Sequence, residues 1–323
     1  MIGVGIDVGG TKTSAVVVDT ESGRVERIVV EGANPAVVGV ERAKSIIAEL
    51  LTRIRRSVEE PIEVVGIGSA GVGQGFWVEV YRDAISLAGL SPRIVGVYED
   101  HCVAHFACFQ GGDGLVLVSG TGSSIYAKCR GISFRIGGWG HLIDDDGSAY
   151  QVGRDGIRAA LLYYDGRSEP TKLLDELLQF LGIDDPRLAI PKIYGSPNPK
   201  LVIASFAPIV VELAERGDAV AQRILSSALQ AMKLMIEAGL ERMRRLGCSA
   251  GPIAIVGGFA EGIRDRVEEL LRAFRSRGVD TVRECMPQDC AALAYALWAH
   301  GDDRWRLVVD VCYKARRGVP QSL

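Results

Sequence analysis

Two stretches of the chain share one pattern, in which an apolar run enters a short turn of glycine, serine and threonine and a second apolar run leaves it. The first is GIDVGGTKTSAVVVD, at residues 5–19, and the second is LVLVSGTGSSIYAK, at residues 115–128. β-Branched apolar runs on both sides of a turn predict strands, so each stretch is predicted to form a hairpin whose tip is rich in hydrogen-bond donors. This repeat predicts two copies of one α/β unit.

The segments that follow each hairpin support this arrangement. The periodicity predicts these elements before residue 110: strands at 2–8, 13–19, 25–30, 64–68 and 94–98, with helices at 40–54, 78–88 and from about 101. It predicts these after the second hairpin: a strand at 134–136, a largely helical region at 148–246, a strand at 253–259, a helix at 262–277, a strand at 281–283 and a helix at 290–299. We therefore expect two domains, 1–110 and 111–323, with the helix near 290–300 packing back on the first.

The first turn is not a Walker A loop. Gly5 and Gly10 have the required spacing, but Thr11 stands where lysine is needed and Lys12 comes one place late. GIGSAG, at residues 66–71, formally matches the dinucleotide fingerprint, but no helix opens within its glycines, so we interpret it as a strand end beside a ligand. The two hairpin tips are better suited to bind phosphate through backbone N–H groups and hydroxyls.

Composition excludes several classes of protein. Of 323 residues, 24% are charged and the net charge is −3, which gives no sign of a nucleic-acid or membrane surface. No apolar run reaches the ~18 residues of a membrane span, and no signal peptide is recognisable, so we expect a cytoplasmic protein. The seven cysteines form no C-x-x-C pair, which disfavours a zinc site. We interpret His101, Cys102, His105 and Cys108 as part of a buried helix with small apolar thiols.

Two further motifs carry candidate ligand-binding groups. Asp100 ends a predicted buried strand, where a carboxylate either faces a ligand or caps the next helix, and the sequence leaves both open. GGWGHLIDDDGSAY, at residues 137–150, combines close-approach glycines with Trp139 as an apolar wall and with His141 and Asp145 as partners for sugar hydroxyls. Its three consecutive aspartates also suggest a metal, but a turn and helix cap at 146–148 explains them equally well.

Taken together, DVGGTKT, SGTGS, VGGF and GGWGH…D-x-GSAY resemble the motifs of the superfamily of acetate kinases, sugar kinases, heat-shock chaperones and actin. Within it, the chain resembles the N-acetylglucosamine kinase type, close to the BadF/BadG/BcrA/BcrD ATPase group. The likeness runs from Gly5 to about Trp298. It implies an α/β fold of two ribonuclease-H-like, actin-like ATPase domains that face an interdomain cleft.

The resemblance implies ATP and Mg²⁺ as cofactors and a small sugar as substrate, with Asp7 holding Mg²⁺ through water. It implies these nucleotide contacts: Gly10, Thr11, Lys12, Thr13, Thr121, Ser205, Gly257, Gly258 and Gly262. It implies these sugar contacts: Asn34, Asp100, Ser123, Ser124, Gly138, Trp139, Gly140 and Asp145. Asp100 would be the general base. Ala36 and Ser124 replace an aromatic residue and an asparagine of the family, which predicts a loosened preference for the acetamido group. The clustered-cysteine zinc motif of the related repressor and glucokinase family is absent.

We therefore expect an ATP-dependent kinase of the primary hydroxyl of a hexose or N-acetylhexosamine, which forms a homodimer and has no nucleic-acid or membrane partner. One alternative is the ATPase activator of a 2-hydroxyacyl-CoA dehydratase, which needs cluster-binding cysteines and could use Cys108 beside Gly111 and Gly112. Another is a sugar sensor without turnover. The glycines at 111–114 also predict a hinge, and sugar binding is expected to favour a closed state.

Overall fold

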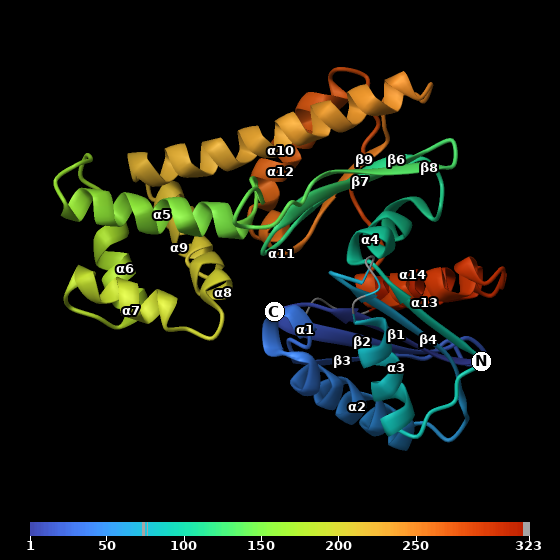
Figure 1. Ribbon diagram of the computed structural model, residues 1–323. Coiled ribbons are helices and arrows are strands. Elements are labelled where there is room, and N and C mark those ends of the chain that lie inside the picture. Colours follow the sequence, from blue (N-terminus) through green and yellow to red (C-terminus); the bar gives the residue numbers. More distant parts are fainter. Residues whose placement is uncertain (73–74, 76, 319–323) are drawn as a thin grey trace. The chain divides into compact units, whose positions relative to one another are not determined.

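The computed structural model describes residues 1–72, 75 and 77–318 (Figure 1). The chain forms two compact units, which we call unit 1 (Met1–Gly111 with Glu284–Leu323) and unit 2 (Gly112–Arg283). The division differs from the sequence-based domain 111–323, because the segment from Glu284 onward belongs to unit 1. Residues 319–323 of that predicted domain lie outside the described residues. Unit 2 is thus an insertion between two parts of unit 1.

Unit 1 is built on one mixed sheet with the strand order β3-β2-β1-β4-β5. Its strands are β1 (Ile2–Val8), β2 (Lys12–Asp19), β3 (Val25–Glu31), β4 (Ile62–Ser69) and β5 (Ile94–Tyr98). The first three are antiparallel, whereas β4 and β5 run parallel to β1. The five strands predicted before residue 110 are therefore confirmed.

Helices cover both faces of this sheet. They are α1 (Pro35–Val38), α2 (Val40–Ser57), α3 (Val78–Leu87), α4 (Asp100–Phe109), α13 (Gln288–Ala299) and α14 (Trp305–Gly318). Because side chains alternate along a strand, Val4 and Ile6 of β1 join a core with α2 and α3, while Gly3 and Gly5 face α13. Figure 1 shows α2 and α3 on one face and α13 and α14 on the other.

The backbone of α13 lies directly against glycines of β1 and β4. A Cβ atom at Gly5 would lie 1.9 Å from the carbonyl oxygen of Asp289, and one at Gly66 would lie 2.1 Å from that of Ala292. The Asp289 side chain, only 2% exposed, accepts hydrogen bonds from the Ser14 hydroxyl at 2.5 Å and from Arg27 Nη2 at 3.0 Å. The absence of Cβ atoms and one buried ion pair thus fix the C-terminal segment on the N-terminal sheet.

Unit 2 repeats the same sheet on a smaller scale, with the order β8-β7-β6-β9. Its strands are β6 (Gly114–Ser119), β7 (Ser123–Cys129), β8 (Ile132–Gly137) and β9 (Ile253–Val256). As in unit 1, the three consecutive strands are antiparallel, and β9 runs parallel to β6. The predicted strand at 281–283 was wrong, because only Thr281 pairs, through an isolated bridge to Ile253. The N–H of Val282 also donates to the carbonyl oxygen of Ile253 at 2.8 Å, but no described residue after Val282 joins the pairing.

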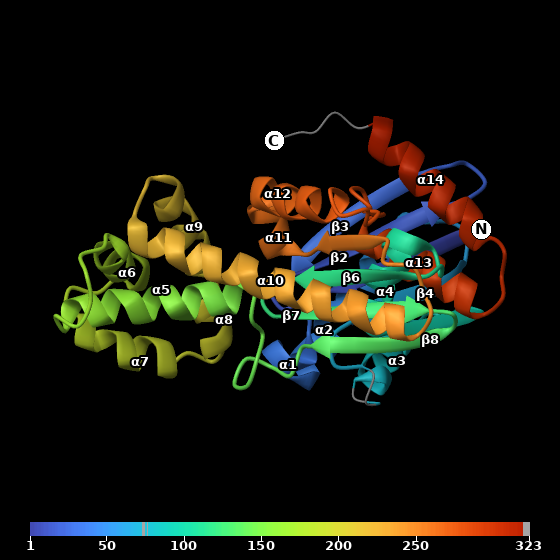
Figure 2. The same cartoon turned by 90° about the horizontal axis from the view of Figure 1, so that it is seen from above.

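A group of helices follows β8. They are α5 (Ala149–Tyr164), α6 (Leu173–Leu181), the 3₁₀ helix η1 (Pro186–Leu188), α7 (Ala189–Tyr194), α8 (Pro199–Ala204), α9 (Ala207–Glu215), α10 (Ala219–Arg245), α11 (Gly258–Gly262) and α12 (Arg264–Arg275). The long helix α10 contacts α5 and α9 at one end and β6, β7 and β8 along the rest, as Figure 2 shows. The helix predicted at 262–277 is α12, and the strand predicted at 253–259 ends at Val256, because the chain begins α11 at Gly258.

Three disulfides join six of the seven cysteines, all of which lie in the described part of the chain. The pairs are Cys108–Cys285, Cys129–Cys248 and Cys290–Cys312. The interpretation of Cys108 as a buried helix thiol was therefore wrong: its partner is 177 positions away, a separation that local spacing does not reveal. Cys108–Cys285 lies beside both chain connections between the units, which follow Gly111 and precede Glu284.

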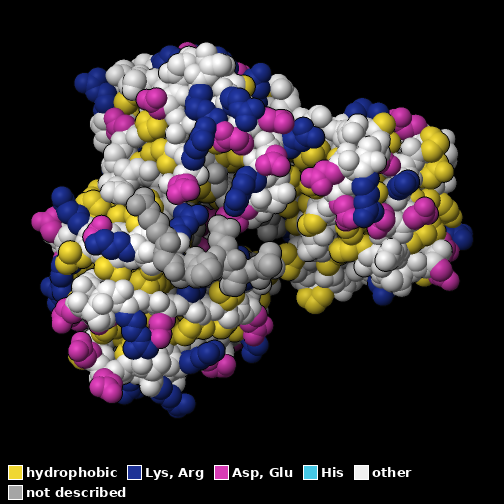
Figure 3. Space-filling view, turned by 180° about the vertical axis from the view of Figure 1, so that it is seen from behind, with side chains coloured by type: hydrophobic (Ala, Val, Ile, Leu, Met, Phe, Trp, Pro, Cys, Tyr) yellow, Lys and Arg dark blue, Asp and Glu magenta, His cyan; other side chains and the backbone are white. Residues whose placement is uncertain are grey.

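The surface carries charges of both signs. Figure 3 shows acidic and basic side chains interspersed over one face of the molecule. None of the helices in the described ranges combines the length and the apolar character needed to cross a bilayer.

Because α13 lies so close to the sheet, a single methyl group added to a glycine beneath it should lower the stability of the protein markedly. Gly66→Ala should lower the free energy of unfolding by about 3 kcal/mol, because overpacking against main-chain atoms cannot be relieved by a rotamer change. Thermal and urea unfolding followed by circular dichroism would measure this. Gly262→Ala is the matched control, since a Cβ atom there meets nothing within 4 Å. Equal stability of the Gly66→Ala and Gly262→Ala variants would contradict the packing described.

The position of Cys108–Cys285 predicts the behaviour of a nicked chain. In a Cys129→Ala/Cys248→Ala variant, cleavage after Arg167, in an exposed stretch of unit 2, should leave the two fragments joined by Cys108–Cys285 alone. On a denaturing gel the fragments should migrate as one band without reductant and as two bands with it. Two bands without reductant would contradict this disulfide.

Candidate functional site

The carboxyl ends of β1, β4 and β5 bring the predicted polar residues of unit 1 to one edge of the sheet. Asp7 is in register with Gly68, and Gly68 is in register with Tyr98. The chain leaves β5 after Tyr98 and begins α4 at Asp100. Asp7 and Asp100 therefore belong to the same edge, which is where ligands bind in sheets of this kind.

Asp100 is not the cap of α4. The cap position belongs to Glu99, which makes no capping hydrogen bond, and Asp100 is the first residue of the helix. Its Oδ1 accepts a hydrogen bond from the N–H of His101 at 2.8 Å. Burial raises the pKa of the Asp100 carboxyl; positive charge on His101 opposes the rise and the Glu99 carboxylate adds to it. The carboxylate is thereby made more basic than an ordinary aspartate.

The first hairpin tip is held closed by its own backbone. The N–H of Gly9 donates to the carbonyl oxygen of Lys12 at 3.0 Å, and Thr11 and Lys12 are exposed beyond this bond. Thr13 differs from the prediction: it is fully buried, and its hydroxyl accepts the N–H of Ala33 at 3.0 Å. Thr13 thus joins the tip to the segment before α1, while Gly10, Thr11 and Lys12 form its outer part.

Asn34 lies beside this tip but uses its side chain within the protein. Its Oδ1 accepts the N–H of Ala36 at 2.9 Å and caps α1, and its Nδ2 donates to the carbonyl oxygen of Ala70 at 3.3 Å. The side chain of Asn34 is buried and Ala36 is exposed. Asn34 therefore connects β4 to α1, and a sugar contact from its amide would have to be shared with these bonds.

Two groups of oxygen ligands in unit 1 are relevant to a divalent cation. Asp7 is half-buried next to the donor-rich tip, and carboxylate oxygens are the ligands that Mg²⁺ prefers. Glu99, Asp100 and His101 also bring potential ligand atoms within 4.8 Å of one another. The imidazole in that group favours zinc or other transition metals over Mg²⁺. Asp7 is thus the residue better suited to the predicted Mg²⁺.

In unit 2, the second hairpin tip and the glycines after β9 are neighbours. Gly257 has a φ of +110°, and a Cβ atom there would lie 2.4 Å from the carbonyl oxygen of Ser119. The carbonyl oxygen of Thr121 accepts the N–H of Tyr150 at 3.2 Å, which ties the tip to α5. Gly258 and Gly262 are exposed and have open space around them. The predicted nucleotide residues of these two motifs therefore come together.

Ser205, predicted as a further nucleotide contact, lies at the end of α8. Its hydroxyl donates to the carbonyl oxygen of Leu201 at 2.8 Å, within its own helix. No hydrogen bond of the described residues connects it to the tip at Thr121 or to α11.

The GGWGH segment forms a left-handed turn over β7. Gly138 and Gly140 have φ of +70° and +90°, which only glycine adopts without strain. A Cβ atom at Gly138 would lie 2.7 Å from the Cβ of Ser124, so position 138 leaves no room for a side chain. Trp139 is 68% exposed, with the Arg135 guanidinium 5.6 Å from its ring centre. The indole is therefore available to stack on an apolar ligand face.

Asp145 is the most constrained residue of this segment. It has a φ of +67° and is 4% exposed, and its Oδ2 lies 2.9 Å from Nζ of Lys200. A Cβ atom at Gly122 would lie 2.8 Å from the same carboxylate oxygen. Lys200 was missed by sequence reasoning, because it lies 55 positions further along the chain and no spacing rule connects it to the aspartates.

The other polar residues of the segment build its frame. Ser123 donates its hydroxyl to the carbonyl oxygen of Asp146 at 2.5 Å, and Ser148 caps α5. This confirms the interpretation of 146–148 as a turn and cap. His141 contacts Tyr150 edge-on at 5.1 Å, and its pKa is lowered by burial and then by the positive charge of Lys200. His141 is therefore favoured in its neutral form, as a hydrogen-bonding group without charge.

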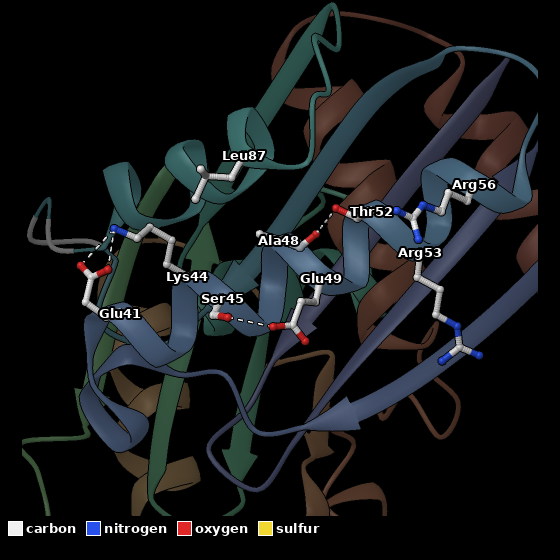
Figure 4. Close-up of a pocket in the computed structure, with 9 residues that line it drawn as sticks. All are labelled: Glu41, Lys44, Ser45, Ala48, Glu49, Thr52, Arg53, Arg56 and Leu87. Atoms are coloured by element: carbon white, nitrogen blue, oxygen red, sulfur yellow. Dashed lines mark hydrogen bonds and ion pairs between the residues drawn. The ribbon is translucent and has the colours of Figure 1, made fainter.

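A groove of about 570 Å³ lies elsewhere in unit 1, along the outer face of α2 (Figure 4). Glu41 pairs with Lys44 there at 2.9 Å, and Ser45 donates to Glu49 at 2.9 Å. Its walls include none of the residues that the sequence predicted for ligand binding. The polar groups along it partner one another on a solvated helix face.

Comparison with known proteins agrees with the two-unit architecture. The model of the BadF/BadG/BcrA/BcrD ATPase family matches residues 4–288. An N-acetylmuramic acid/N-acetylglucosamine kinase of Clostridium acetobutylicum is 34% identical over 74% of this chain and 79% of its own length. An N-acetyl-D-glucosamine kinase of Dictyostelium discoideum is 31% identical over 80% and 85%.

Among solved structures, a protein of Chromobacterium violaceum assigned as an N-acetylglucosamine kinase superposes with a TM-score of 0.71. It covers 91% of this chain and 98% of its own, at 20% sequence identity. At that identity the likeness concerns the fold, which is the two-domain actin-like fold of the sugar kinases. From the family model and from relatives above 30% identity, the chain belongs to the BadF/BadG/BcrA/BcrD ATPase family.

Proposed function

We propose that the protein is an ATP-dependent kinase that transfers the γ-phosphoryl group to the primary hydroxyl of a hexose or N-acetylhexosamine. The observation that carries the proposal is the position of Asp100, whose side chain is 39% exposed and lies at the same sheet edge as Asp7 and the first hairpin tip. The names of relatives at 31–34% identity support a sugar acceptor. Phosphoryl transfer needs positioning and charge stabilisation more than covalent chemistry, and both glycine-rich tips suit that task.

In this mechanism Asp100 accepts the proton of the attacking hydroxyl. The sugar oxygen forms a bond to the γ-phosphorus as the bond from that phosphorus to the bridging oxygen breaks, and ADP leaves. A base whose pKa is raised toward the working pH accepts the proton more readily, and general-base catalysis typically contributes ~10²–10⁴-fold. The N–H groups of Gly10 and Thr11, together with Lys12, would donate to phosphate oxygens from unit 1. Thr121 and Gly258 are the corresponding candidates within unit 2.

The residues present also fit a Mg²⁺ ion. Asp7 would hold it through water, since its half-buried carboxylate lies next to the phosphate-binding tip. The ion would supply positive charge to the phosphate oxygens during transfer.

The sugar would lie against the GGWGH segment. Trp139 offers an exposed ring for stacking, and the buried Asp145 carboxylate would accept a hydrogen bond from a sugar hydroxyl. Ala36 is small and exposed, and Ser124 carries a short side chain beside Gly138. These two positions support a site that accepts sugars with or without an acetamido group.

The activator alternative has less support. A bridging iron–sulfur cluster needs cysteine thiolates, and Cys108, the candidate nearest the glycines, is bonded to Cys285. The GGWGH segment has no role in that reaction. A sensor without turnover would not need Asp7, Lys12 and Asp100 together, and the assay below separates it from the kinase.

The cytoplasmic location and the homodimer remain predictions. Use of ATP together with three disulfides suits an intracellular protein of a hyperthermophile, a group in which disulfides are frequent. The low asparagine content of the chain agrees, because asparagine is labile at high temperature.

A panel of sugars tests the function directly. With ATP and Mg²⁺, ADP release should depend on a hexose or N-acetylhexosamine, and glucose should reach kcat/KM within ~10⁴-fold of N-acetylglucosamine because the acetamido contacts are loosened. N-acetylmuramic acid and glucosamine belong in the panel. ADP release that is independent of every sugar would contradict a sugar kinase, and sugar binding without ADP release would identify a sensor.

Asp100→Asn tests the general base. The substitution should lower kcat by roughly 10²-fold or more while changing the sugar dissociation constant little, because only proton transfer is lost. Asp175→Asn, at an exposed aspartate in the first turn of α6, is the matched control and should keep normal kcat.

The pH dependence provides a second readout of the same residue. Because burial raises the pKa of Asp100, its base form is lost at a higher pH than that of an ordinary aspartate. In the native enzyme kcat/KM should therefore fall as the pH drops through this raised pKa, and the acid limb should disappear in Asp100→Asn. An unchanged acid limb in the variant would assign it to another group.

A further inference from the structure

Building on the proposed function, we infer that Lys200 binds the sugar together with Asp145 and helps to determine which sugar is accepted. The two side chains form a donor–acceptor pair with Nζ and Oδ2 2.9 Å apart. A hydroxyl group both donates and accepts hydrogen bonds, so one sugar hydroxyl can donate to Asp145 while its neighbour on the ring accepts from Lys200. Asp145 was expected to bind sugar; Lys200 was not.

The pair is rigid on the Asp145 side. The carboxylate is 4% exposed, and a charge so buried is stable only when it is paired. The φ of +67° and the tight contact with Gly122 leave the side chain little room to move. Lys200 supplies the opposite charge at 2.9 Å, so the buried carboxylate has a partner inside the loop.

The pair is also rigid on the Lys200 side. Asn198 caps α8 by accepting the N–H of Leu201 at 3.1 Å, and Pro199 begins the helix, so Lys200 lies in its first turn. Helix α8 packs closely on α5, because a Cβ atom at Gly153 would lie 1.9 Å from the carbonyl oxygen of Ile203. The backbone of Lys200 is therefore held in place by α5 and α8, which follow the GGWGH segment in unit 2.

The ammonium group keeps donors available for a ligand. An ammonium has three N–H donors, and Asp145 is the hydrogen-bond partner of Nζ among the residues that the structure describes. The Lys200 side chain is 31% exposed, whereas that of Asp145 is 5% exposed. Lys200 is thus the more accessible member of the pair. It lies near His141, whose lowered pKa favours the neutral imidazole.

The arrangement predicts discrimination between sugars that differ at one hydroxyl. Two neighbouring hydroxyls in the right configuration satisfy both members of the pair, whereas an epimer inverted at either carbon satisfies only one. A site that leaves a buried polar group unpaired rejects the wrong ligand strongly. Removing the ammonium should therefore weaken the binding of the preferred sugar more than the binding of its epimers.

The test uses Lys200→Met, which keeps the length of the side chain and removes its charge. The KM and the calorimetric dissociation constant for the preferred sugar should rise about 10–100-fold, the range for a hydrogen bond to a charged group. The KM for ATP should change by less than about twofold, and the preference over epimers should shrink about tenfold. Lys192→Met on the neighbouring helix α7, where the side chain is exposed, is the matched control and should leave all these values unchanged.

A folded Lys200→Met protein with native sugar affinity and native epimer preference would overturn the inference and leave the proposed function intact. A rise in KM that is equal for all epimers would also overturn it, because it would indicate a purely structural role. If Lys200→Met does not fold, Lys200→Arg keeps the charge pair but shifts its donors, and an unchanged epimer preference in that variant would count against the inference. Failure of the native protein to bind or phosphorylate any sugar would refute the proposed function itself, and the inference with it.

Discussion

The fold depends on the contact between the α13 backbone and the glycines of β1 and β4. Strands normally present side chains to a covering helix about 10 Å away, but Gly5 and Gly66 let the main chain of α13 approach closely. Asp289 then reaches Ser14 and Arg27, so one buried carboxylate connects β2, β3 and the C-terminal segment. Because β1, which carries Gly5, also carries Asp7 near its carboxyl end, the packing that completes the core of unit 1 also holds the first hairpin tip in register.

Unit 2 achieves rigidity by different means. The segment at 137–150 is joined to the second hairpin by two hydrogen bonds. The Ser119 hydroxyl donates to the carbonyl oxygen of Gly147, and the Ser123 hydroxyl donates to that of Asp146. Left-handed residues at Gly138, Gly140 and Asp145 turn the chain sharply enough to return to this tip. The residues that we propose for nucleotide and for sugar binding in this unit are thus joined by hydrogen bonds.

The architecture was largely predictable from the sequence because its signals are local. Alternating apolar runs and glycine turns identified both hairpins, and the 3–4 spacing identified α2. What the sequence left undetermined involves partners far along the chain. Lys200 pairs with Asp145 across 55 positions, Cys108 with Cys285 across 177, and Ser14 with Asp289 across 275. The role of Thr13 was also missed, since a hydroxyl pattern does not distinguish a ligand contact from the buried bond that Thr13 makes to Ala33. The strand predicted at 281–283 was wrong because its β-branched residues suit a strand, but only Thr281 has a bridge partner.

The insertion of unit 2 has a consequence for how the protein is made. A ribosome releases the strands of unit 1 first, then all of unit 2, and only afterwards the segment from Glu284 that contains α13. Until then Val64 and Phe106, which pack against α13 and its neighbours in the finished protein, have no cover. Unit 2 is contiguous and can fold as it emerges, whereas unit 1 must wait until the segment from Glu284 has been made. The first half of the nascent chain is therefore the part most exposed to aggregation, and the part for which a chaperone would matter most.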